Sequence, residues 1–126
     1  MRRIDLITQA CDPKTLTVGQ LMQDALFTCT AQTDALTIGR LMTKQNFGGL
    51  PVVAEDSSLV GLVTEYDLLQ AMIEGRDLRK VFASEIMTTQ PLAARENMTL
   101  EEVANLFQDR YVTRLPVVRG KQLVGI

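Results

Sequence analysis

The sequence predicts an α+β fold made of two pseudo-symmetric copies of one β-α-β-β-α unit. One observation is that Leu50-Pro51-Val52-Val53 recurs as Leu115-Pro116-Val117-Val118, 65 residues later. A second is that Val18-Gly19-Gln20-Leu21-Met22 matches Ala83-Ser84-Glu85-Ile86-Met87 at the same offset. Self-similarity at a fixed spacing is typical of a duplicated structural unit. We therefore expect a lead-in at 1–17, a first repeat at 18–74, a linker at 75–82 and a second repeat at 83–126.

The first repeat shows its elements in order. A short strand is expected at Phe27–Thr30, and Asp34 is a good N-cap for a helix that carries Ala35, Ile38, Leu41 and Met42. The β-branched runs Leu50–Ala54 and Leu59–Thr64 then predict two strands around a polar turn. A second helix should follow. Its apolar residues at helical spacing are Tyr66, Leu69 and Ile73.

The second repeat has the same pattern as far as it extends. Thr99 and Glu102 form a capping-box signature before a helix with apolar residues at Leu100, Val103, Ala104 and Phe107. After its strands the chain stops at Ile126, where a closing helix would be expected. We expect the second repeat to be truncated at its C-terminal end, as a fragment of a longer protein or as a degenerate copy.

Composition narrows the function classes. The net charge of −2 argues against a nucleic-acid-binding protein, because phosphate binding needs a basic surface. No apolar run is long enough for a membrane helix. The chain has no histidine, which removes the commonest general base and every histidine-based metal site. With two cysteines and no disulfide framework, we expect a cytoplasmic, non-catalytic protein without a metal.

The densest polar motif is Gly61-Leu62-Val63-Thr64-Glu65-Tyr66-Asp67, where a strand meets a helix. Thr64 and Asp67 are three residues apart, so one helical turn brings them together at the helix N-terminus. The motif allows two interpretations. It is a normal N-cap, because Ser, Thr and Asp are preferred there. It is also suited to a phosphorylated ligand, with a hydroxyl for the phosphate and a carboxylate for ribose hydroxyls.

The combination of motifs resembles the CBS domain, a tandem nucleotide-binding unit named after cystathionine beta-synthase. The resemblance rests on the two segments "VGQLM" and "ASEIM", both "LPVV" strands, and "LVGLVTEYDLL". It covers residues 18–126. The resemblance implies a CBS-domain pair with two clefts between its repeats, which in many members hold AMP, ADP, ATP or S-adenosylmethionine. It also implies a homodimer formed by packing one disc-shaped pair on another.

The resemblance also assigns roles to residues of the first cleft. Asp67 matches the family's ribose-binding carboxylate, and Thr64 matches its phosphate-side hydroxyl. Gly49-Leu50-Pro51 match the backbone beside the base and phosphate. Thr88 and Ala93, from the segment that opens the second repeat, are expected to face the same ligand. Gly48-Gly49 stand where some members have a basic residue, which argues against a strong grip on several phosphates.

The second cleft is expected to be incomplete. Arg114 stands where some members use a basic residue against phosphate, with Gln23 and Thr28 as its neighbours from the first repeat. The matching Thr-x-x-Asp motif is absent from the second repeat as far as the sequence extends. Only the first cleft carries a complete set of matching residues.

Three hypotheses about function follow. The leading one is a regulatory sensor of an adenosine-containing ligand that needs no catalytic cofactor. The alternative is a ligand-free dimerisation or protein-interaction module with the same fold. An enzyme is the least supported class, since the sequence has no histidine and no Walker-type phosphate loop.

Overall fold

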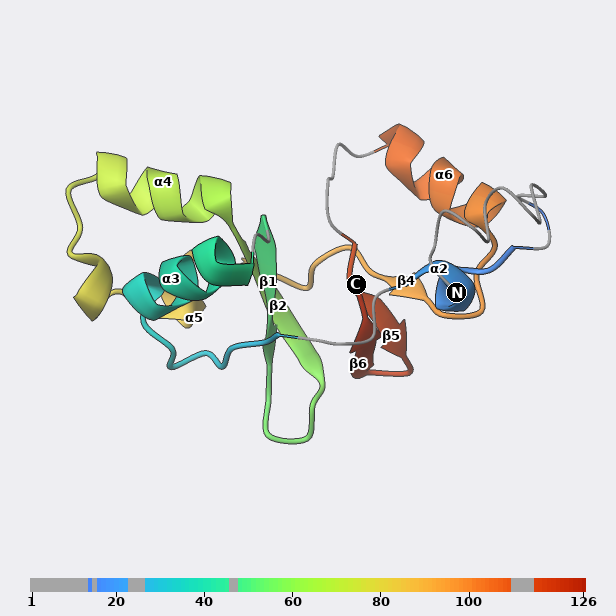
Figure 1. Cartoon of the computed structure of the whole chain (residues 1–126), viewed down its shortest axis with the longest axis horizontal. Helices are drawn as coiled ribbons and strands as arrows, with labels where there is room; N and C mark the ends of the chain where they lie inside the picture. The colour runs from blue at the N-terminus through green and yellow to red at the C-terminus, as the bar shows by residue number, and fades with distance from the viewer. Residues whose placement is uncertain (1–13, 15, 23–26, 46–47, 110–114) are drawn as a thin grey trace. The chain divides into compact units, whose positions relative to one another are not determined.

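The computed structural model describes residues 14, 16–22, 27–45, 48–109 and 115–126. Helices and mainly antiparallel strands are mixed along the chain, which makes the fold α+β (Figure 1). The chain divides into two compact units, a central unit at Phe27–Pro91 and a terminal unit formed by Met1–Leu26 with Leu92–Ile126. Among the helices of the described residues, none has the length and apolar character to span a bilayer.

The central unit contains a three-stranded antiparallel sheet with β2 in the middle. Its strands are β1 (Gly49–Val53), β2 (Leu59–Thr64) and β3 (Thr88–Thr89). Its helical elements are α3 (Ala35–Gln45), α4 (Glu65–Ile73), the 3-10 helix η1 (Leu78–Lys80) and α5 (Ala83–Ile86). The polar turn between β1 and β2 is held by Asp56, whose carboxylate accepts hydrogen bonds from the backbone and hydroxyl of Ser58.

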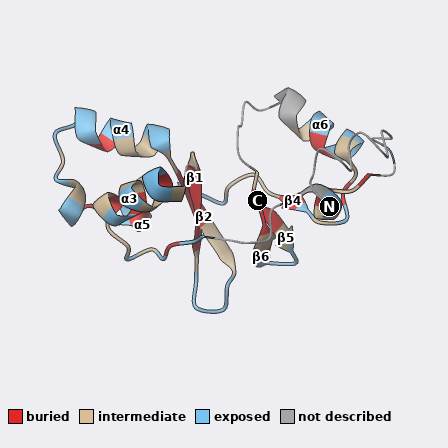
Figure 2. Cartoon of the chain, viewed as in Figure 1, coloured by how far each residue is buried: buried red, intermediate tan, exposed pale blue. Residues whose placement is uncertain are grey.

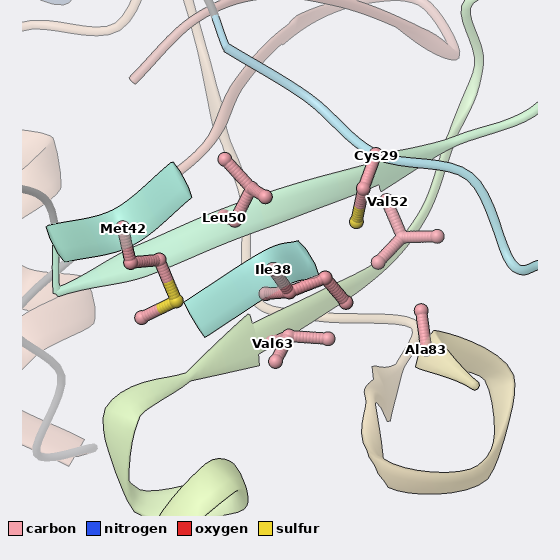
Figure 3. Packing of buried hydrophobic residues seen from close by; sticks show 7 residues of the cluster. All are labelled: Cys29, Ile38, Met42, Leu50, Val52, Val63 and Ala83. Atoms are coloured by element: carbon pink, nitrogen blue, oxygen red, sulfur yellow. The ribbon is translucent and has the colours of Figure 1, made fainter. Parts of the chain in front are cut away.

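The core of the central unit lies between α3 and one face of the sheet. Ile38 and Met42 of α3 are buried against the apolar side chains of β1 and β2 (Figure 3). The buried members of this cluster are Cys29, Ile38, Met42, Leu50, Val52, Val63 and Ala83. Asp34 begins α3 as the sequence predicted, since its carboxylate accepts hydrogen bonds from the backbone and hydroxyl of Thr37 at 2.9 and 2.7 Å.

The terminal unit repeats this plan with fewer elements. Its sheet has the order β4 (Ala94–Arg95), β5 (Val117–Arg119) and β6 (Gln122–Gly125), with β4 parallel and β6 antiparallel to β5. Its helices are α2 (Val18–Leu21) and α6 (Leu100–Asp109). The predicted capping box begins α6, since Glu102 accepts from the backbone and hydroxyl of Thr99 at 3.4 and 3.3 Å. The buried cluster of this unit is Val18, Ala94, Met98, Val103 and Val117.

The two compact units do not follow the boundaries of the two sequence repeats. Helix α5 and strand β3 open the second repeat in sequence, yet they complete the sheet and core of the central unit. Helix α2 opens the first repeat and belongs to the terminal unit, where Val18 and Gly19 donate to the backbone of Met98 and Glu96 at 2.8 Å. Each unit is therefore built from parts of both repeats.

Several local expectations differ from the structure. The segment expected as a strand at Phe27–Thr30 makes only an isolated bridge, from Cys29 to Val52. The expected linker at 75–82 contains η1 and the buried Val81, whose carbonyl accepts from the backbone of Ala35 at 2.7 Å. Ala104 and the α4 residues Tyr66, Leu69 and Ile73 are exposed although they are apolar. Figure 2 shows α4 with much of its length coloured as exposed. The side chain of Phe107 lies outside the described residues.

Both units place a glycine of the sheet against a methionine of the neighbouring helix end. An added Cβ at Gly61 would overlap the side chain of Met87, with Cγ at 2.9 Å, and would lie 3.1 Å from the carbonyl oxygen of Thr88. Gly125 has the same relation to Met22. These glycines are required because a methionine side chain occupies the space above the strand.

This packing predicts the effect of Gly61→Ala. The added methyl group displaces Met87 and should lower the free energy of unfolding by about 1–3 kcal/mol, the usual range for overpacking a core. Urea unfolding of Gly61→Ala, Met87→Ala and the double variant measures the effect. Because removal of Met87 frees the space, the double variant should be more stable than the sum of the single effects predicts. Strict additivity would contradict the contact.

Candidate functional site

Thr64 and Asp67 meet where β2 becomes α4. Thr64 has extended backbone angles and is the N-cap of the helix. Its backbone N–H and hydroxyl donate to Oδ2 of Asp67 at 2.8 and 3.0 Å, and the backbone N–H of Asp67 donates to the Thr64 hydroxyl at 3.4 Å. The two half-buried side chains therefore form a reciprocal capping box.

The capping box occupies only one oxygen of the Asp67 carboxylate. Both hydrogen bonds to the carboxylate end on Oδ2, and no hydrogen bond from the described part of the chain reaches Oδ1. An ionised carboxylate has about four lone-pair positions on its two oxygens. Asp67 can therefore fix the helix start with one oxygen and accept hydroxyl donors with the other.

The sheet register places Gly49, Pro51 and Thr88 on the same face of the sheet as Thr64. Gly49 is paired with Thr64, Pro51 with Leu62, and Leu62 in turn with Thr88 on the far side of β2. Side chains alternate between the two faces of a strand, and directly paired residues share a face. Thr64 and Thr88 therefore lie on one face of the sheet, opposite the face that packs on α3, and Thr88 is exposed.

Leu50 and Pro51 contribute no exposed side chain. Both are fully buried, and Leu50 points into the core with Ile38. The carbonyl oxygen of Pro51 already accepts the backbone N–H of Cys29 at 3.0 Å. The side chains of these two residues are therefore not available to a ligand, and a contact through their backbone, which the resemblance implies, stays a prediction.

The remaining predicted residues are distributed differently. Ala93 is half-buried and belongs to the terminal unit. Thr28 is exposed in the central unit. Gln23 and Arg114, which were expected to belong to the second cleft, lie outside the described residues.

The charges around the Thr64–Asp67 box are acidic. The first turn of α4 carries Glu65 and Asp67. The segments that line up beside it, Gly48–Pro51 and Thr88–Thr89, carry no basic residue. Among the described residues of the central unit, ion pairs join Arg76 to Glu85 and Arg79 to Asp77, both outside these segments. This half of the site therefore offers hydroxyl and carboxylate groups without a cation.

Reactive and metal-binding groups are not part of this arrangement. Burial raises the pKa of the Cys29 thiol to about 11, so the thiolate that would act as a nucleophile is scarce at neutral pH. Within the described residues, no cluster of three or more potential metal ligands was found. The chemistry present is that of hydrogen-bonded recognition.

One surface of the central unit was missed at the level of sequence. A groove between α3 and α4 is lined mainly by apolar residues, and helix α4 exposes apolar side chains beside it. The signal was present, because α4 has apolar residues on more than one face. The spacing of Tyr66, Leu69 and Ile73 indicated only that these side chains share one face of a helix.

A family model for the CBS domain matches residues 18–74 and 83–126. The chain belongs to the CBS-domain family. Among curated relatives, protein YlbB of Bacillus subtilis is 32% identical over 110 residues, which cover 86% of this chain and 74% of the relative. The CBS domain-containing protein YhcV of the same organism is 38% identical over 87 residues, covering 68% of this chain and 61% of the relative.

Solved structures show the same fold. CBSX2 in complex with AMP is 31% identical with a TM-score of 0.75, and the match covers 87% of each chain. A second structure of CBSX2, from Arabidopsis thaliana, has a TM-score of 0.76 at 30% identity, with 87% of this chain and 86% of that chain covered. The CBS domain pair of MJ0100, in complex with 5'-methylthioadenosine and S-adenosyl-L-methionine, is 25% identical with a TM-score of 0.80 over 88% of this chain and 87% of that one. The fold is therefore that of a CBS-domain pair.

Proposed function

We propose that this CBS pair is a regulatory module that binds an adenosine-containing ligand, such as AMP, ADP, ATP or S-adenosylmethionine. The observation that carries the proposal is the Thr64–Asp67 capping box, in which one carboxylate oxygen of Asp67 takes no hydrogen bond from the described residues, at the end of the strand that pairs with Thr88. Structures of related CBS pairs hold AMP, and 5'-methylthioadenosine with S-adenosyl-L-methionine.

Each group has a separate role in the proposed site. Oδ1 of Asp67 accepts the ribose hydroxyls, and the Thr64 hydroxyl donates toward the phosphate side. The backbone of Gly49, Leu50 and Pro51 lies beside the base, and Thr88 completes the part of the site that the central unit supplies. Hydrogen bonds to a charged group such as the Asp67 carboxylate contribute roughly 1.5–3 kcal/mol each.

The charge of the site favours ligands with few phosphates. Glu65 and Asp67 lie at the helix start, and the neighbouring segments of the central unit carry no basic residue. Each additional phosphate brings negative charge toward these carboxylates, which is unfavourable. We therefore expect AMP and S-adenosylmethionine to bind more tightly than ATP.

Thermal unfolding with a panel of ligands tests the proposal. A ligand that binds only the folded chain should stabilise it by about 2.7 kcal/mol at 100 times its dissociation constant, and so raise Tm. We expect this shift with AMP or S-adenosylmethionine and a smaller one with ATP at equal concentration. GMP and free ribose 5-phosphate are the matched controls for base and phosphate. If no adenosine compound changes Tm, the proposal is wrong.

We further propose that the module is non-catalytic, acts in the cytoplasm and works as a homodimer. The absence of histidine and of a Walker-type loop supports a regulatory role. The free thiol of Cys29 is consistent with a reducing compartment. A ligand-free dimerisation module is the second candidate, and the exposed apolar side chains of α4 favour it.

A further inference from the structure

Gln90 has a backbone conformation that L-amino acids rarely adopt. Its φ angle is 48°, in the left-handed region. Among the described residues, the other positive φ angles belong to Ser57 and to two glycines, Gly75 and Gly120. Glycine enters this region readily because it has no Cβ atom, whereas the Cβ of a glutamine comes too close to the backbone. The conformation of Gln90 is therefore held by the structure around it.

The neighbouring proline adds to this strain. The ring of a proline normally keeps the residue before it in an extended conformation. Pro91 follows Gln90 directly, and its own φ is fixed near −65° by the ring. Of these two residues, only Gln90 can adopt the positive φ that the turn uses.

The turn at Gln90 ends strand β3 after two residues. Thr88 and Thr89 pair with Leu62 and Gly61 of β2, and the chain bends at Gln90 directly afterwards. An extended residue at this position would continue β3 along β2. Because side chains alternate between the two faces of a strand, the side chain of such a residue would share the face of Thr88. The left-handed turn instead directs the chain away from β2 immediately after the two threonines.

A packing contact holds the same strand at its other end. Met87 precedes Thr88 and places its side chain over Gly61, the residue of β2 that pairs with Thr89. The strands approach closely here, since an added Cβ at Gly61 would lie 3.1 Å from the carbonyl oxygen of Thr88. Strand β3 is thus fixed by a methionine contact at its start and by a strained turn at its end.

We infer that Gln90 is a positioning residue of the proposed ligand site, and that its left-handed backbone sets the position of Thr88. The inference rests on the function proposed above, in which Thr88 contacts the adenosine-containing ligand. Backbone strain persists only where the surrounding structure over-determines it, and it is concentrated at binding and switch sites. A strained turn that fixes Thr88 before the ligand arrives reduces the ordering that binding requires. Gln90 acts through its φ angle, so a substitution matters through its effect on that angle.

A series of variants at position 90 tests the inference, with AMP as the ligand and isothermal titration as the measurement. Glycine and asparagine tolerate a positive φ, so Gln90→Gly and Gln90→Asn should bind AMP with wild-type affinity or better. Valine is β-branched and resists this region. Gln90→Val should populate the left-handed turn less, and its apparent affinity for AMP should fall in the same proportion, by at least about fivefold. If Gln90→Val does not fold, Gln90→Ala replaces it and should bind AMP more weakly than Gln90→Gly.

Ser57 offers a matched control. Its φ is 68°, and it is exposed in the turn between β1 and β2, at the opposite end of these strands from Thr64. Ser57→Val changes the same backbone property away from the proposed site, so it should lower Tm and leave the AMP affinity at the wild-type value. A turn with a purely structural role would give this same pattern at Gln90, and that result would overturn the inference.

A double-mutant cycle tests whether Gln90 acts through Thr88. Thr88→Ala alone should weaken AMP binding, and adding Gln90→Val to it should cause little further loss, because the two changes affect one contact. Full additivity of the two losses would contradict positioning of Thr88. If the wild type binds AMP and Gln90→Val binds it as tightly as Gln90→Gly, the inference fails while the ligand proposal stands. If the wild type binds no adenosine compound, the ligand proposal fails and the inference fails with it.

Discussion

Replacing Ile38 by alanine is expected to lower the free energy of unfolding of the central unit by about 3 kcal/mol. Ile38 is completely buried and lies at the centre of the cluster between α3 and the sheet (Figure 3). Removing its side chain loses apolar burial and leaves a cavity, and changes of this kind cost 2–5 kcal/mol in well-packed cores. Urea unfolding followed by circular dichroism measures the loss.

A graded series distinguishes this packing effect from a general effect of mutation. Ile38→Val removes a single methyl group, so its cost should be only about 0.5–1.5 kcal/mol. Glu55→Ala, in the exposed turn between β1 and β2, should stay within about 0.5 kcal/mol of the wild type. Equal effects of Ile38→Val and Ile38→Ala would mean that Ile38 is not packed as the structure describes.

Ile38 also shows which parts of the fold were predictable from sequence. Its helical spacing with Ala35 and Met42 follows from local periodicity, and the Asp34 cap follows from the preference of short polar side chains for that position. The two strands after it have the strong β-branched signal of a buried sheet, and β2 has the expected bounds. Local, repeated signals of this kind determine the order of elements.

The exchange of segments between the two units could not be predicted from local sequence periodicity. Pairing of Thr88 with Leu62, and of Ala94 with Val117, joins residues that are far apart in sequence. No local propensity encodes such a contact. The exposure of the apolar side chains of α4 could not be predicted for a related reason. Periodicity shows that a helix has an apolar face but not what covers that face.

Part of the local structure of the candidate site could also be predicted from the sequence. The Thr64–Asp67 pair was predicted both as an N-cap and as a ligand site. The structure confirms the N-cap, and the ligand site stays a prediction. Periodicity alone could not show which of Leu50 and Pro51 faces α3, because β1 is buried on both of its faces. The sheet register decides which face each residue occupies.

The proposed contact of Asp67 with ribose predicts that Asp67→Asn will weaken adenosine-ligand binding by roughly 10- to 100-fold, the loss of about 1.5–3 kcal/mol from a hydrogen bond to a charged group. The amide keeps one oxygen to accept from the backbone of Thr64, so the helix cap is largely retained. It replaces the second acceptor by a donor, which cannot accept ribose hydroxyls. Isothermal titration with AMP measures the affinity.

Asp34→Asn is the matched control, because Asp34 caps α3 through Thr37 in the same way and its hydrogen bonds from Thr37 lower the pKa of its carboxyl group. It changes a cap of the same unit without touching the proposed site, so AMP affinity should stay at the wild-type value. Asp67→Ala should lose both roles, with weak binding and a stability loss of about 1 kcal/mol, typical of a lost cap. If Asp67→Asn binds AMP as tightly as Asp34→Asn does, then Asp67 is only a helix cap, because the open oxygen would have no ligand to bind.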